Sequence, residues 1–302
     1  MKVCCLLNSA SQSTIPLENF LKIEDISIEK HVVSIHQSSD DLKLFLQKVY
    51  AENHVIPHGL GKNKKNKNFN VFFKYIKTIR KIQPNIVHAH HTKAVLLGIL
   101  SQVVFRIPFF VTIHNDFNHF KPHQKFAWYM GCRISDVIIC NSENTKSSLP
   151  HSVQKSQKIH TIYNGVDFDK VKRMAIGNEY THAYTIGTVC RMVPQKDLVT
   201  LLMGFRSYLG DSEAPESSLV LIGDGPERQK LVELAHGLDI QKQVVFKGEM
   251  NRDDVYKELG NLDVFVVSSL YEGFCNAMVE AAGAGLPIVA TVLGSDLSNV
   301  LS

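Results

Sequence analysis

The sequence predicts an α/β protein with two doubly wound parallel sheets, and two observations support this class. Apolar runs of four to six residues recur along the whole chain and are separated by segments with helical periodicity. Such runs are typical of parallel strands that are buried on both faces, with helices covering those faces. The chain has 302 residues and is 44% hydrophobic, so it is long enough to form two domains.

The first half of the chain has the order of elements expected for one such domain. Apolar runs are followed by helical segments, and this alternation places consecutive strands in a parallel sheet. We expect strands at residues 3–7, 31–35, 55–56, 86–89, 109–114 and 136–141. We expect helices at residues 15–22, 40–50, 69–82, 92–104 and 124–135.

The second half repeats the pattern after a polar stretch. We expect strands from residue 184 and at 218–222, 243–248, 263–268 and 288–290, with helices at 198–208, 252–260 and a short one ended by Gly283 or Gly285. Residues 170–182 contain no long apolar run, so they separate the two halves. The predicted domains are therefore residues 1–170 and 183–302, both Rossmann-like, joined by a linker at residues 171–182.

Composition narrows the setting in which the protein works. The six cysteines show no paired spacing and are predicted to be reduced core residues of a cytoplasmic protein. The most apolar stretch, residues 94–113, is interrupted by polar residues and is better explained as a helix followed by a strand than as a membrane span. Residues 1–150 carry 19 Lys and Arg against 10 Asp and Glu, while residues 151–302 carry 14 against 19.

Two glutamates eight positions apart form the most informative motif in the chain. Glu272 is predicted to lie in the loop after a buried strand, and Glu280 on the helix that follows. Open α/β sheets bind ligands at this edge, so Glu280 could accept hydrogen bonds from ribose hydroxyls and Glu272 could reach a sugar hydroxyl. Backbone N–H groups near the helix start would point at a diphosphate, namely those of Gly273, Phe274, Asn276 and Ala277. The alternative is an ordinary strand–helix–strand unit with solvated glutamates.

This segment resembles the two-glutamate signature of a large family of retaining glycosyltransferases, the family 4 type also called glycosyl transferases group 1. The likeness includes E-G-F at residues 272–274, the second glutamate, and G-x-P-I-V-A-T at residues 285–291. It implies the GT-B fold, in which two Rossmann-like domains face a cleft. It also implies transfer of a sugar from a UDP- or GDP-linked donor to a glycan or lipid-linked acceptor, with retention of anomeric configuration.

Three further residues match positions of that family. Arg191 and Lys196 follow a strand and resemble the family's cations that bind the donor diphosphate, which implies that no metal is needed. His114 ends a strand in a V-T-x-H pattern, where the family's histidine contacts the transferred sugar. Solvated loop cations and a structural histidine are the alternative interpretations.

Other motifs favour a structural role. His88, His90 and His91 form an H-A-H-H segment, but no carboxylate or cysteine completes a metal site at ligand spacing. The D-x-D at residues 167–169 lies inside an N-G-V-D turn pattern. The glycine turn at residues 223–225 lacks the remaining residues of a dinucleotide or phosphate loop, so we expect it to pack near the nucleotide.

A basic segment next to aromatic residues suggests a membrane surface. The lysines are followed by Phe72, Phe73, Lys74, Tyr75 and Lys77, a composition that suits anionic lipid and an enzyme acting on lipid-linked acceptors at the inner face of the membrane. A solvated loop is the alternative, and we expect no nucleic-acid partner although such a patch has the same composition. The lysines of this segment are Lys62, Lys64, Lys65 and Lys67.

Two departures from the family leave other functions open. Residues 8–14 replace the family's glycine-rich loop after the first strand, and the chain ends at Ser302, where relatives continue. We therefore expect an incomplete second domain. An inactive homologue that binds nucleotide without turnover is one alternative, and a nucleotide-sugar epimerase of the same architecture is the other.

Overall fold

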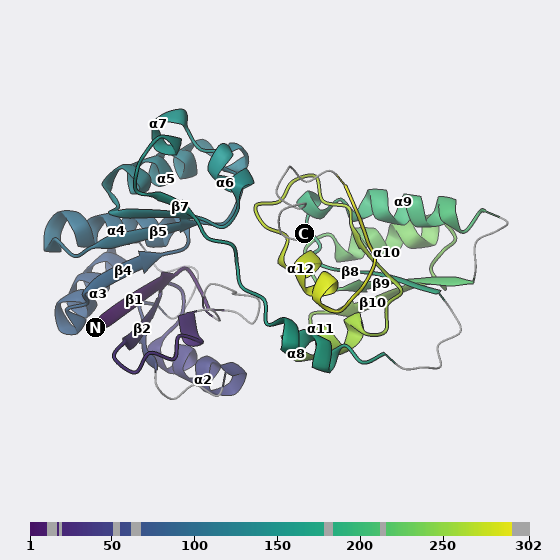
Figure 1. The fold of residues 1–302 in the computed structure, drawn as a ribbon, viewed down its shortest axis with the longest axis horizontal. Helices are drawn as coiled ribbons and strands as arrows, with labels where there is room; N and C mark the ends of the chain where they lie inside the picture. The colour runs from purple at the N-terminus through teal and green to yellow at the C-terminus, as the bar shows by residue number, and fades with distance from the viewer. Residues whose placement is uncertain are drawn as a thin grey trace. The chain divides into compact units, whose positions relative to one another are not determined.

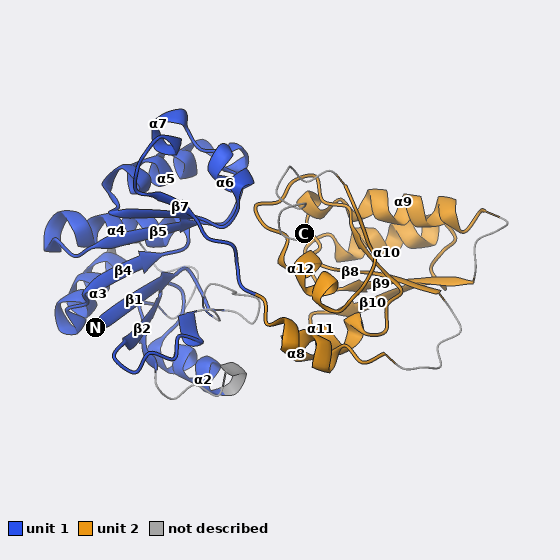
Figure 2. Cartoon of the chain, viewed as in Figure 1, with its two compact units in different colours: residues 1–165 blue, residues 166–302 orange. Residues whose placement is uncertain are grey.

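The chain forms two compact units, residues 1–165 and residues 166–302 (Figure 2). The computed structural model describes residues 1–10, 17, 20–50, 55–61, 68–177, 184–211 and 216–291. The predicted first domain ends at residue 170 and is followed by a linker at residues 171–182, whereas the two compact units meet between Gly165 and Val166. The division falls there because Val171, on helix α8 (Phe168–Met174), is fully buried in the core of the second unit.

The first unit is built on a seven-stranded sheet in which every neighbouring pair of strands is parallel. The strands run in the order β3-β2-β1-β4-β5-β6-β7 (Figure 1). They are β1 (Lys2–Leu7), β2 (Glu29–Ser34), β3 (Val55–Gly59), β4 (Ile86–Ala89), β5 (Phe109–Ile113), β6 (Val137–Cys140) and β7 (Ile159–Thr161). The helical elements are α2 (Ser39–Tyr50), α3 (Asn68–Ile82), α4 (Thr92–Phe105), η1 (Phe117–His119), α5 (Pro122–Ile134), α6 (Glu143–Ser147) and α7 (His151–Gln154).

Both faces of the first sheet are covered, as the apolar runs predict. Cys4 and Cys5 are adjacent in β1 and fully buried, yet they belong to different clusters, because successive side chains of a strand point to opposite faces. Cys4 packs in the cluster that includes residues of α3, α4 and α5, and Cys5 packs with Leu42 and Leu46 of α2. A strand with this pattern requires cover on both sides, which the helices supply.

The second unit contains a five-stranded, fully parallel sheet in the order β10-β9-β8-β11-β12. One face is packed by α9 and α10, and the other by α8, α11 and α12 (Figure 1). The strands are β8 (Tyr184–Val189), β9 (Ser217–Ile222), β10 (Val244–Gly248), β11 (Val264–Val267) and β12 (Ile288–Ala290). The helices are η2 (Pro194–Lys196), α9 (Leu198–Tyr208), α10 (Arg228–Gly237), α11 (Arg252–Leu259) and α12 (Asn276–Gly283), in addition to α8.

Each sheet has one point where the strand order reverses, and these points locate the candidate sites. In the second unit β8 lies between β9 and β11, so the chain builds outward on one side of β8 and then crosses to the other. The loops after β8 and β11 therefore leave the sheet in different directions and open a crevice at its carboxyl edge. The same reversal occurs between β1 and β4 in the first unit.

The cysteine and membrane-span predictions can be checked directly. All six cysteines are free, and burial raises the pKa of the Cys5, Cys132 and Cys140 thiols to about 12, which makes them poor nucleophiles. Residues 94–113 form most of α4 and all of β5, as predicted. Across the described ranges, no helix has both the length and the apolar character needed to cross a bilayer.

Candidate donor-binding site

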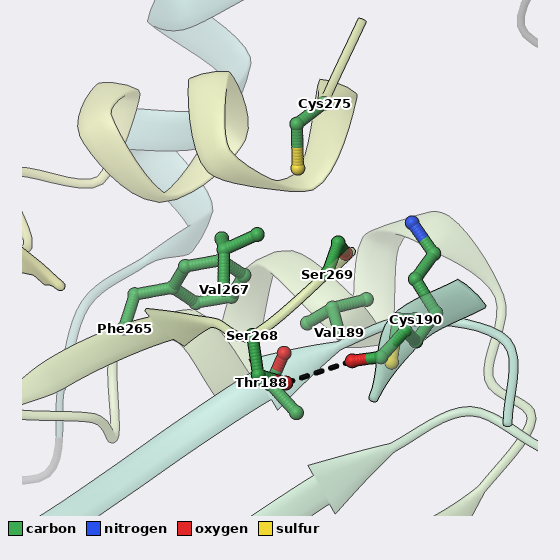
Figure 3. Close-up of a pocket in the computed structure, with 9 residues that line it drawn as sticks. Thr188, Val189, Cys190, Phe265, Val267, Ser268, Ser269 and Cys275 are labelled. Atoms are coloured by element: carbon green, nitrogen blue, oxygen red, sulfur yellow. Dashed lines mark hydrogen bonds between the residues drawn. The ribbon is translucent and has the colours of Figure 1, made fainter. Parts of the chain in front are cut away.

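A small pocket lies at the strand-order reversal of the second sheet (Figure 3). It is bounded by the carboxyl ends of β8 and β11 and by the start of α12, where the Cys275 side chain points toward it. The location matches the edge at which doubly wound sheets bind ligands. The lining residues are Thr188, Val189, Cys190, Lys196, Phe265, Val267, Ser268, Ser269 and Cys275.

Lys196 and Glu272, both predicted site residues, form an ion pair beside this pocket. Lys196 Nζ contacts Glu272 Oε1, and the Ser269 hydroxyl donates to the same oxygen at 2.7 Å. The two charged side chains are 19% and 10% exposed. Burial lowers the pKa of Lys196, but the neighbouring Glu272 carboxylate more than offsets this, so the pKa is raised and the ammonium group stays charged.

Hydrogen bonds between the two loops hold this pair in place. Ser268 Oγ donates to the Lys196 carbonyl at 2.8 Å, the dashed line in Figure 3. The Leu270 N–H donates to the Gln195 carbonyl at 2.9 Å, and Gln195 Nε2 donates to the Tyr271 carbonyl at 2.9 Å. The loop after β8 is therefore joined to the loop after β11 through Gln195 and through the backbone of Lys196.

Arg191, the other predicted cation, is exposed on a loop whose backbone is fixed by the glycine turn. A Cβ on Gly223 would lie 2.0 Å from the Cys190 carbonyl oxygen, and one on Gly225 would lie 2.4 Å from that of Met192. Gly223 also has φ +124°, which favours glycine. Within the described residues the Arg191 guanidinium makes no hydrogen bond or ion pair. The glycine turn thus packs against the loop that presents this free cation.

The start of α12 places backbone donors close to the same pocket. Its N-cap, Cys275, makes no side-chain capping hydrogen bond, and the first turn contains no acidic residue. The first N–H groups of a helix have no partner inside the helix, and together with the helix dipole they favour an anion. Gly273 is buried, while Phe274, Asn276 and Ala277 are partly exposed, so the predicted backbone donors surround this helix start.

Glu280 lies on the face of α12 that packs toward α11. The Glu280 side chain is 5% exposed, and its Oε1 is 2.8 Å from Arg252 Nη1. The Tyr256 hydroxyl is 3.5 Å from the same oxygen. Sequence reasoning identified Glu280 but missed Arg252 and Tyr256, because both precede it by more than twenty residues and lie on another helix.

His114, in the first unit, belongs to a chain of neutral imidazoles. His114 Nε2 is 3.1 Å from His90 Nδ1, and burial lowers the pKa of His114 to about 3. His88 Nε2 is 2.7 Å from Thr112 Oγ1, and burial lowers its pKa to about 4. No group of three His, Cys, Asp or Glu in the described part of the chain is placed to hold a metal ion.

The basic surface predicted near residue 70 is described only in part. Lys62, Lys64, Lys65 and Lys67 lie outside the described residues. On α3, Phe72 and Phe73 are 40% and 57% exposed. Tyr75, included among the surface aromatics, is instead fully buried, and its hydroxyl is 2.5 Å from Ser101 Oγ.

The fold defines the chain as a two-domain protein of the GT-B class, with a pocket at the carboxyl edge of the sheet in the second unit. The family model described as "Glycosyltransferase Family 4" matches residues 29–170, and that described as "Glycosyl transferases group 1" matches residues 169–298. The chain therefore belongs to the family 4 type of glycosyltransferases, as the signature predicted.

Similar proteins agree with this assignment. An uncharacterized glycosyltransferase of Methanocaldococcus jannaschii is 26% identical over 242 residues, covering 72% of this chain and 58% of that protein. The Escherichia coli UDP-Gal:alpha-D-GlcNAc-diphosphoundecaprenol alpha-1,3-galactosyltransferase is 26% identical over 239 residues, covering 73% of this chain and 61% of that protein. The chain thus spans about three fifths of the length of these relatives. The crystal structure of Anabaena HepE with UDP and glucose has the same fold, with a TM-score of 0.79 at 18% identity over 97% of this chain and 81% of that one.

Proposed function

We propose that this protein transfers a sugar from a nucleotide sugar to a glycan or lipid-linked acceptor with retention of anomeric configuration. The observation that carries the proposal is the Lys196–Glu272 pair at the carboxyl ends of β8 and β11, with exposed Arg191 on the same loop after β8 as Lys196. Two cations at this edge of a doubly wound sheet suit a diphosphate. Similarity to the galactosyltransferase of Escherichia coli, whose name includes a UDP-linked donor, supports a nucleotide sugar as substrate.

Each predicted site residue of the second unit then has a defined role. Arg191 and Lys196 bind the diphosphate, assisted by the backbone N–H groups at the start of α12. An ammonium group has three donors, so Lys196 can keep its contact with Glu272 while it donates to a phosphate oxygen. Glu272 binds a hydroxyl of the donor sugar, and Glu280 binds the ribose.

The two cations also serve the chemical step. The bond between the sugar C1 and the diphosphate oxygen breaks, positive charge develops on the sugar ring, and negative charge builds on the leaving group. Arg191 and Lys196 stabilise that negative charge. The acceptor hydroxyl oxygen forms the new bond on the face that the diphosphate leaves, and its proton passes to the departing diphosphate oxygen. Attack on this face retains the configuration. We propose that these cations take the place of a metal, so that EDTA leaves the transfer rate unchanged.

His114 is proposed to contact the transferred sugar as a neutral imidazole. Its pKa of about 3 keeps it uncharged at neutral pH, so it acts as a hydrogen-bonding group and not as a cation. Replacing it by alanine should lower the transfer rate and leave UDP affinity unchanged. An equal loss of UDP affinity would place His114 elsewhere in the mechanism.

Calorimetry with UDP, GDP and their sugars tests the donor site. We expect Arg191→Ala to weaken nucleotide binding by about tenfold, the loss of one charge-assisted interaction. Arg206→Ala is the matched control, since Arg206 is an exposed arginine on α9 of the same unit. Absence of binding by the wild type would refute the donor-site assignment. Binding without transfer to any glycan or lipid-linked acceptor would favour an inactive homologue, and conversion of the donor without an acceptor would reveal an epimerase.

We further propose that α3 binds an anionic membrane surface, which would bring the protein to a lipid-linked acceptor. Phe73, Lys77 and Lys81 are exposed and follow one another at four-residue spacing, so they form one stripe of α3. The opposite side of the helix packs Tyr75 and Ile79 into the core. The Escherichia coli relative is named for an acceptor with a diphosphoundecaprenol carrier, which is membrane chemistry.

Vesicle sedimentation tests this surface. The wild type should bind vesicles that contain phosphatidylglycerol more strongly than vesicles of phosphatidylcholine alone. Lys77→Glu with Lys81→Glu should abolish the difference, whereas Leu44→Ser should not, since Leu44 is an exposed apolar residue of α2 in the same unit. Equal binding of the lysine variant and the wild type would refute the proposal.

A further inference from the structure

The contact between Arg252 and Glu280 needs an explanation beyond stability. Glu280 is 4% exposed, and burying a carboxylate is costly unless a cation and hydrogen bonds compensate. Apolar residues of similar volume usually stabilise a core equally well. The side chain that compensates Glu280 is itself 21% exposed, so the pair reaches from the core toward solvent.

The place of Arg252 in its helix is unfavourable for a cation. It is the first residue of α11, directly after the N-cap Asn251, whose side chain accepts from the Asp254 N–H. The helix dipole disfavours positive charge in the first turn, and the two residues that follow, Asp253 and Asp254, show the usual preference. A cation at this position is therefore better explained by its contact with Glu280 than by its own helix.

The geometry directs both side chains toward the ligand edge of the sheet. Helix α11 follows β10 and α12 follows β11, so both helices begin at the carboxyl edge of the parallel sheet. Side chains of a helix lean toward its N-terminus, so the Glu280 carboxylate leans toward that edge. Arg252 and Tyr256 are four residues apart on one face of α11 and meet the same oxygen, Glu280 Oε1.

We propose that Arg252 is a positioning residue that holds the Glu280 carboxylate for the donor ribose and thereby makes the site select ribonucleotides over their deoxy analogues. The inference rests on the proposed function, because it takes the ribose as the ligand of Glu280. Arg252 places a positive charge next to Glu280 Oε1 and fixes the position of that oxygen. A charged, fixed acceptor binds ribose hydroxyls more strongly than a mobile one.

Comparison of UDP with 2′,3′-dideoxyuridine diphosphate tests the proposal by calorimetry. The wild type should bind UDP about tenfold more tightly than the dideoxy compound, the loss expected for hydrogen bonds to a charged group. In Arg252→Gln this preference should fall to about threefold or less, while affinity for the dideoxy compound stays unchanged. Arg252→Lys should restore most of the preference, since it keeps a positive charge next to Glu280 Oε1.

Controls separate this role from the other possibilities. Lys257→Gln on the same helix, where Lys257 is 62% exposed and pairs with Asp254, should keep the wild-type preference. The far-UV circular dichroism spectrum of each variant reports that the fold is retained. Equal loss of affinity for both ligands in Arg252→Gln would mean that Arg252 contacts another part of the nucleotide, and a gain in UDP affinity would mean that it competes with the ribose. Either result overturns the proposal.

Different results would refute the proposed function and the proposed role of Arg252. A wild-type protein that binds neither UDP nor GDP refutes the donor site as a whole. A wild-type protein that binds UDP and the dideoxy compound equally retains the donor site but removes the ribose from Glu280. If the wild type prefers UDP over the dideoxy compound and Arg252→Gln keeps that preference, the donor site stands and only the positioning role of Arg252 is refuted.

Discussion

The Lys196–Glu272 pair should be strongly coupled in stability, and a double-mutant cycle measures this. Removing one partner of a buried ion pair typically costs about 3–5 kcal/mol, because it leaves an uncompensated charge. Glu272 is 10% exposed and would lose its cationic partner, so Lys196→Met should lower the free energy of unfolding by about 3 kcal/mol. Glu272→Gln should cost less, about 2 kcal/mol, because the longer lysine at 19% exposure can turn toward water.

The double variant, Lys196→Met with Glu272→Gln, should lose no more free energy of unfolding than Glu272→Gln alone. With both charges gone, neither is left uncompensated, and methionine fills the volume of the lysine stem. A loss of about 2 kcal/mol in the double variant gives a coupling free energy of about 3 kcal/mol. Exposed ion pairs couple by less than about 1 kcal/mol, so this value distinguishes a buried pair from a surface one.

Urea unfolding provides the assay, and the chain contains its own reference signal. The single tryptophan, Trp128, is buried in the core of the first unit, so its fluorescence follows that unit. Far-UV circular dichroism follows both units. The variants should shift the circular dichroism transition and leave the fluorescence transition in place. Coupling below about 0.5 kcal/mol would refute the reasoning, because it would show that water screens the pair.

Three further predictions concern the first unit and the helix glycines. Burial holds the pKa of His114 at about 3 and that of His88 at about 4, below the usual 6.5, so the unfolded chain binds more protons than the folded chain as pH falls. The urea midpoint of Trp128 fluorescence should therefore decrease as the pH is lowered from about 6.5 to these values. A constant midpoint would contradict this expectation. Tyr75→Phe should cost about 1 kcal/mol in the same assay, because it leaves Ser101 Oγ without one of its partners. Gly98→Ala should lower the melting temperature, since the added Cβ would lie 2.1 Å from the buried Phe109 ring, whereas Gly204→Ala, with open space around it, should raise it by helix propensity alone.

The strands and most helices could be predicted because their signals are local. A parallel strand buried on both faces is a continuous apolar run, and β4 and β12 occur at the predicted residues. Helix α8 was not predicted, because seven residues with three lysine or arginine side chains give no clear apolar stripe. That helix is stabilised by tertiary contacts, with Val171 fully buried and Phe168 against Gly283.

The site was predictable only as far as the edge of the sheet. Strand ends can be read from sequence, and Lys196 and Glu272 follow two strands that flank the same reversal, so their approach could be expected. The helix residues that contact Glu280 could not be predicted, because an arginine at the start of a helix, such as Arg252, is indistinguishable in sequence from a surface residue. Its proposed role depends on the contact with Glu280, 28 positions further along the chain, which local sequence patterns do not encode.

The distribution of charge in the second unit suits the proposed donor. Glu272 and Glu280 are each compensated by a cation of the same unit, so neither requires the ligand for charge balance. Arg191 is exposed and, within the described residues, unpaired. In the proposed site, a diphosphate would add its negative charge where an exposed guanidinium is available and where the Lys196 ammonium group has further donors. The ion pairs orient both glutamates beforehand, so in the proposed site the free energy of ordering them is not subtracted from the affinity for a nucleotide sugar.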